Sequence, residues 1–117
     1  MKSPDQIQFS PKNKNEALAS DIESRFEEFA KTLRIIEGRR IDLELNAYVS
    51  NRRDGIHVAF SGESTEEIIE NFKKALRDNL NSIPEGDYPL KGLNLEWKYM
   101  IDDEEQPGAG SAALLSS

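Results

Sequence analysis

Five stretches of the chain repeat apolar residues at a regular spacing and predict the main elements of the fold. In the first, apolar residues recur every three or four positions, as on one face of a helix: Leu18, Ile22, Phe26, Phe29, Leu33 and Ile36. Ser10 followed by Pro11 is a suitable helix start, and Gly38 is a suitable stop. We therefore predict a helix from about residue 12 to residue 37.

Two segments with strict alternation follow the first predicted helix. Residues 41–50 and 56–61 alternate apolar and polar side chains, which predicts half-buried strands. Between them, Asp54-Gly55 favours a type I′ turn, because both central residues of that turn need positive φ. A two-residue turn would pair Val49 with Phe60 and would place the apolar side chains on one face. The sequence therefore predicts a tight hairpin.

The remaining patterned segments predict a second helix and a last strand. Ser64 and Glu67 have the spacing of a capping box, and the apolar spacing of residues 65–83 is helical. Pro84 is expected to end this helix. Residues 93–101 alternate again and predict a strand.

The two ends of the chain carry weaker patterns. Residues 1–6 are polar and predicted to be loose, and Ile7–Phe9 allows one short strand. From Asp102 the chain is acidic and then rich in glycine, alanine and serine. This composition predicts a disordered tail over residues 102–117, which leaves residues 1–101 as a single domain.

The order of elements predicts an α+β fold with two helices packed on one face of an antiparallel sheet. If Ile7–Phe9 is a strand, the order is that of a ferredoxin-like βαββαβ fold. If it is not, a three-stranded sheet with two helices remains. The first arrangement is favoured, because right-handed crossovers would then place both helix stripes over the apolar face of the sheet.

Composition narrows the possible functions of the chain. Of its 117 residues, 37% are hydrophobic and 32% charged, with a net charge of −7, so non-specific binding to nucleic acids or anionic membranes is not expected. The absence of cysteine excludes disulfides and thiolate chemistry. The first residues lack the apolar core of a signal peptide, and a cytoplasmic location is expected.

No residue pattern in the chain is typical of an enzyme. His57 is the single histidine, and without cysteines it has no evident partners for a metal site or for nucleophilic catalysis. Neither a G-x-S-x-G motif nor a glycine-rich phosphate-binding loop occurs. We therefore predict no catalytic activity, no cofactor and no metal.

Elimination leaves binding to another protein as the predicted function, in a regulatory, inhibitory or assembly role, with a homodimer as one form. The partner is expected to be basic, such as a nucleic-acid-binding protein. The alternative is a nucleic-acid-binding module that uses arginines gathered at the hairpin tip. A further candidate surface is the outer edge of the hairpin, where a strand could be added. The candidate binding residues on the polar sheet face and the hairpin tip are Asp42, Glu44, Tyr48, Arg52, Arg53, His57 and Arg77.

Overall fold

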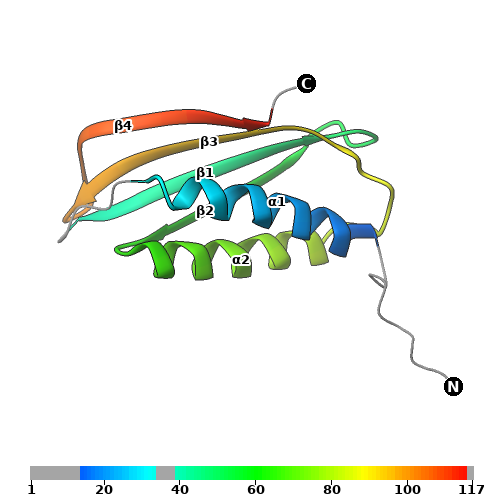
Figure 1. The fold of residues 1–117 in the computed structure, drawn as a ribbon, viewed down its shortest axis with the longest axis horizontal. Helices are drawn as coiled ribbons and strands as arrows, with labels where there is room; N and C mark the ends of the chain where they lie inside the picture. Colours follow the sequence, from blue (N-terminus) through cyan, green and yellow to red (C-terminus); the bar gives the residue numbers. More distant parts are fainter. Residues whose placement is uncertain (1–13, 34–38, 116–117) are drawn as a thin grey trace, which may run out of the picture.

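The computed structural model of the chain describes residues 14–33 and 39–115, and it is an α+β fold with two helices and a four-stranded antiparallel sheet (Figure 1). The elements in chain order are α1 (Lys14–Ala30), β1 (Arg40–Val49), β2 (Ile56–Gly62), α2 (Thr65–Asn81), β3 (Leu90–Ile101) and β4 (Glu104–Leu115). The predicted strand Ile7–Phe9, the loose residues 1–6 and the helix start at Ser10 lie outside the described residues.

The strand order of the sheet is β2-β1-β3-β4, with every neighbouring pair antiparallel. This order differs from the predicted ferredoxin-like βαββαβ arrangement. The strand that follows α2 pairs with β1, so β1 lies inside the sheet between β2 and β3. In the described chain the order is αββαββ, because the segment predicted as a tail supplies the fourth strand.

The prediction of a disordered tail over residues 102–117 is wrong for the residues that the structure describes. Ile101 pairs with Glu104, so the acidic run contains a two-residue turn rather than the start of a tail. Asp102 and Asp103 have φ angles of 52° and 64°, and positive φ at both central residues is what a type I′ turn requires. Aspartate tolerates this conformation better than most residues, because its short side chain can hydrogen-bond locally.

Aromatic side chains of β3 explain why a glycine-rich segment forms strand β4. A Cβ atom at Gly110 would lie 2.5 Å from the indole of Trp97, and one at Gly108 would lie 3.0 Å from the ring of Tyr99. The rings therefore occupy the space that side chains on β4 would otherwise fill, an arrangement that compensates for glycine in a strand. Gly108 also has a φ of 118°, which disfavours any other residue there.

The prediction of a tight turn at Asp54-Gly55 is also wrong. Ala47 is the last residue of β1 that pairs with β2, opposite Ile56, and the connection between the two strands is the longer loop of residues 50–55. The end of β1 pairs instead with β3, where Val49 lies opposite Leu90. The register differs from the predicted one by an even number of residues, and the apolar side chains therefore still share one face.

Both helices lie on the same face of the sheet (Figure 1). The serine half of the predicted capping box of α2 is present, since the hydroxyl of the N-cap residue Ser64 accepts a hydrogen bond from the Glu67 amide at 3.2 Å. The Glu67 carboxylate in turn accepts from the amide of Glu63 at 2.7 Å. Helix α1 ends at Ala30, earlier than the predicted residue 37.

The core fills the space between the helices and the facing side of the sheet. Its centre is a cluster of three phenylalanines, in which the ring centroids of Phe26 and Phe72 are 4.2 Å apart and those of Phe60 and Phe72 are 5.0 Å apart. Alternate residues of β1, from Ile41 to Val49, point into this core. The intervening residues of β1 must then project from the opposite side of the sheet.

Candidate functional site

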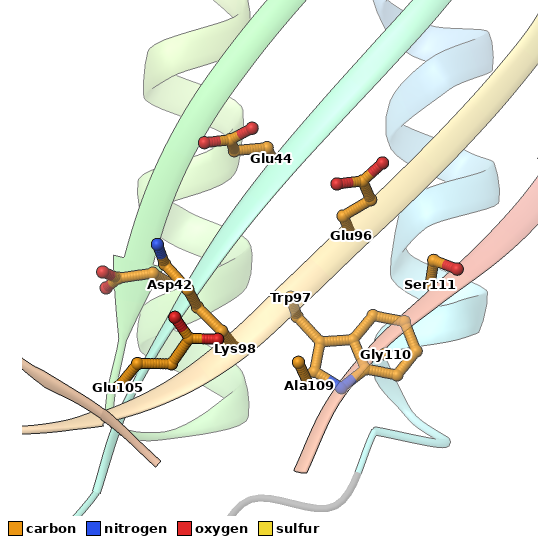
Figure 2. Close-up of a pocket in the computed structure, with 9 residues that line it drawn as sticks. All are labelled: Asp42, Glu44, Glu96, Trp97, Lys98, Glu105, Ala109, Gly110 and Ser111. Carbon is orange, nitrogen blue, oxygen red and sulfur yellow. The ribbon is translucent and has the colours of Figure 1, made fainter. Parts of the chain in front are cut away.

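We call the side of the sheet away from the helices the open face, because no described element covers it. Figure 2 shows this face with both helices behind the strands. Strand alternation places here the polar residues of β1, β2 and β3. Two of the predicted binding residues, Asp42 and Glu44, therefore lie side by side on β1 with the residues of β3 opposite them.

The open face contains a hollow of about 490 Å³ across β1, β3 and β4, which we call the acidic depression (Figure 2). Its floor on β4 is formed by small residues, whereas β1 and β3 contribute long charged side chains. The lining residues are Asp42, Glu44, Glu96, Trp97, Lys98, Glu105, Ala109, Gly110 and Ser111. Four carboxylates and one lysine thus surround the hollow, which favours a positively charged guest.

The two carboxylates at the centre of this surface oppose each other. Glu44 pairs directly with Glu96 across β1 and β3. On the other side, Glu44 lies opposite Ala59 of β2, and Glu96 lies opposite Ser111 of β4. Among the described residues neither carboxylate has an ion pair, and like charges directly opposite on adjacent strands are unfavourable. A cation placed between them would relieve this repulsion.

Asp42, by contrast, already has a cation beside it. The Arg40 Nε atom donates to Asp42 Oδ1 at 2.9 Å, and Arg40 Nη2 donates to Asp103 Oδ1 at 3.1 Å. The hydrogen bond to Asp42, followed by that to Asp103, raises the pKa of Arg40 above its usual value. Arg40 therefore joins the start of β1 to the turn between β3 and β4, and Asp42 is less available to a guest than Glu44 or Glu96.

Two further predicted residues share the open face but do not line the acidic depression. Tyr48 is 51% exposed, and it is the one large hydrophobic side chain exposed in the described part of the chain. His57 on β2 lies opposite Asn46, with its Nδ1 atom 2.8 Å from Asn46 Oδ1. The imidazole is exposed, and its contact is with a neutral amide rather than with a carboxylate.

The arginines predicted at the hairpin tip have different environments. Arg52 holds the loop together, because its Nε donates to the Gly55 carbonyl at 3.0 Å and its Nη2 lies 3.3 Å from Asp54 Oδ2. Arg53 is exposed in the same loop. Arg77 belongs to the helix layer, where it contacts carboxylates of α1. The contacts of Arg77 thus give no support to a shared basic cluster.

Arg77 connects the two helices through Glu23 and Glu16. Its guanidinium donates to both oxygens of Glu23, at 3.0 and 3.1 Å, and also to Glu16. These hydrogen bonds, that to Glu23 first, raise the pKa of Arg77. The Glu23 side chain is only 12% exposed, so it depends on this partner more than a surface carboxylate would.

We expect Arg77→Met to lower the free energy of unfolding by about 1–2 kcal/mol, because it leaves the mostly buried Glu23 without its closest cation. Urea denaturation would measure this change. The matched control is Arg25→Met, since Arg25 pairs with an Asp21 side chain that is 46% exposed. That control should change stability by less than about 0.5 kcal/mol. Equal losses in the two variants would contradict a special role for Glu23.

Sequence reasoning missed the part of the site that lies beyond β1. Glu96 was assigned only to the polar side of a strand, and Glu105 and Ser111 were assigned to a tail. One signal could have located them. The acidic pair Asp102-Asp103 suits a tight turn, and in the segment after it Gly110 and Ala112 would share one phase of a strand while Ser111 and Ala113 share the other. This small-residue alternation is weak beside the pattern of 41–49, because neither phase is strongly apolar.

The described residues hold no group of three or more histidine, aspartate or glutamate side chains placed to bind a metal ion. In the same part of the chain, neither helix is long and apolar enough to cross a membrane.

Comparison of the chain with protein-family models, with curated proteins and with solved structures finds no match.

Proposed function

We propose that this protein is a binding module that holds a basic segment of another protein in the acidic depression. The observation that carries the proposal is the direct opposition of Glu44 and Glu96 at the centre of the open face. Their mutual repulsion is present in the free protein and would be relieved by a lysine or arginine side chain of the partner. Binding therefore removes an unfavourable interaction and adds two favourable ones.

The surroundings of this pair suit an extended guest. The floor of the depression at Ala109, Gly110 and Ser111 has only small side chains, so a peptide backbone could approach the sheet closely. Trp97 also lines the hollow, but its indole packs against the ring of Phe29 of α1, with the centroids 5.5 Å apart, on the helix side of the sheet, so the contacts to a cationic guest come from the carboxylates. A segment with alternating basic residues would place successive charges on the same side, toward the sheet.

The double variant Glu44→Gln/Glu96→Gln should bind a fluorescently labelled peptide of alternating arginine and glycine about tenfold more weakly than the wild type, which corresponds to about 1.4 kcal/mol. Fluorescence anisotropy at several salt concentrations would measure this loss. Affinity of the wild type should fall as salt rises, because the contacts are between charges near the surface. The variant should be folded and no less stable, since the substitution removes repulsion.

The matched control is Glu66→Gln/Glu70→Gln, which removes the same charge from exposed positions of α2. Equal weakening in both variants would show that only the net charge of the protein attracts the peptide, and the proposed site would then be wrong. A labelled single-stranded oligonucleotide tests the alternative function. Tight binding of it, lost in Arg52→Ala/Arg53→Ala, would favour nucleic acid as the partner.

A further inference from the structure

Beyond the acidic depression, the open face continues as a regular series of residue pairs along β1 and β3. Three successive pairs point to this face: Glu44 with Glu96, Asn46 with Asn94, and Tyr48 with Gly92. Each strand rises about 3.3 Å per residue, so neighbouring pairs on one face are about 6.6 Å apart. Tyr48 therefore lies about 13 Å along β1 from Glu44, on the same face of the sheet.

The ring of Tyr48 is held in place by glycines on both sides. A Cβ atom at Gly92 would lie 3.3 Å from the Cδ2 atom of Tyr48, and one at Gly55 would lie 3.9 Å from its Cδ1 atom. The ring thus lies between the backbone of β3 and the residue that precedes β2. Tyr48 is nevertheless 51% exposed. It offers an apolar surface that is already positioned, which lowers the entropy cost of a contact with a guest.

The charges around Tyr48 favour a neutral side chain as its contact. Arg52 donates to the carbonyl of Gly55, the glycine beside the ring. Arg53 is exposed in the same loop and forms no ion pair with the described residues. A cationic side chain of a guest would be repelled here, whereas an aromatic side chain would gain a favourable ring contact.

We propose that the guest of the acidic depression is an extended segment in which a basic residue and an aromatic residue are four positions apart, the aromatic one packing on Tyr48. The inference rests on the proposed function, because the basic residue between Glu44 and Glu96 sets the register of the guest. An extended guest along β1 has the same rise per residue as the strand, so every second side chain meets the next pair. The intervening one meets the two asparagines, whose amides both donate and accept hydrogen bonds.

Two nine-residue peptides of equal composition and charge test this spacing. Each has one central arginine and two tryptophans, with glycine and serine elsewhere. The tryptophans lie four positions from the arginine on both sides in the first peptide, and three positions in the second. Only the first peptide presents arginine and tryptophan on the same side, in either direction of binding. The wild type should bind it about fivefold more tightly than the second, as measured by titration of amide chemical shifts.

Three variants separate this inference from the proposed function. Tyr48→Ala should remove the preference for the first peptide, and Tyr48→Phe should retain it because the ring is kept. Glu44→Gln/Glu96→Gln should weaken the binding of both peptides. Equal affinity of the wild type for the two peptides, with both still weakened in the glutamine variant, would overturn the spacing and leave the proposed function in place. So would a preference that Tyr48→Ala leaves unchanged. Binding that does not change in the glutamine variant would contradict the proposed function itself, and with it the register of the guest.

Discussion

A chain truncated after Ile101 should have a free energy of unfolding about 4 kcal/mol lower than that of a chain that keeps β4. Trp97 and Tyr99 pack against Gly110 and Gly108, so the truncation removes their cover as well as one of the two neighbours of β3. Burial of one large apolar side chain stabilises a fold by about 1.5–3 kcal/mol. Because small domains have about 5–15 kcal/mol in total, this loss should be visible as a large shift in a urea transition.

One reference protein makes this result specific to the strand. A chain that ends at Leu115 removes only the last two residues and should match the full chain. An unchanged midpoint after truncation at Ile101 would show that residues 102–117 are a dispensable tail.

Phe72→Ala should be among the most damaging substitutions in the core, with a loss of about 3–5 kcal/mol. Phe72 is fully buried, and its ring centroid lies 4.2 Å from that of Phe26 and 5.0 Å from that of Phe60. Truncating it leaves a cavity between α2, α1 and β2 that these rigid elements cannot collapse to fill. Thermal or urea denaturation, followed by circular dichroism, would measure the loss.

Tyr48→Ala is the control for this substitution, because it also removes an aromatic ring but from a side chain that is 51% exposed. It should change the free energy of unfolding by less than about 1 kcal/mol. Phe72→Leu should recover part of the stability lost in Phe72→Ala, since it restores most of the apolar volume. Similar losses for Phe72→Ala and Tyr48→Ala would mean that the core does not centre on the phenylalanine cluster.

Periodicity was sufficient to predict the helices and three of the four strands. The alternation of β1 is strong, with every second residue from Ile41 to Val49 buried, and α2 has both its N-cap serine and its apolar stripe. These elements are predictable because the spacing of apolar residues along a helix or strand reflects which side chains face the core. The predicted register of the β1–β2 hairpin was wrong because it was derived from the turn propensity of Asp54-Gly55, whereas in the structure the end of β1 pairs with β3, with Val49 opposite Leu90.

The fourth strand could not be predicted from its own residues. Glycine, alanine and serine have low strand propensity, and here they are held by the rings of Trp97 and Tyr99 on the neighbouring strand. Because β4 was not predicted, the residues that it contributes to the acidic depression were not predicted either. Asp42 and Glu44 were predicted from β1 alone, whereas Glu105 comes from β4 and joins them only through the turn at Asp102 and Asp103.

The short connection between β3 and β4 has a kinetic consequence. Every pairing of β4 lies close in sequence, from Ile101 with Glu104 to Leu93 with Leu115, whereas β1 reaches across α2 to pair Arg40 with Met100. Closing a short loop costs little chain entropy, and local contacts favour rapid folding. An edge strand that follows a tight turn can therefore widen a sheet without slowing the folding of the rest of the domain.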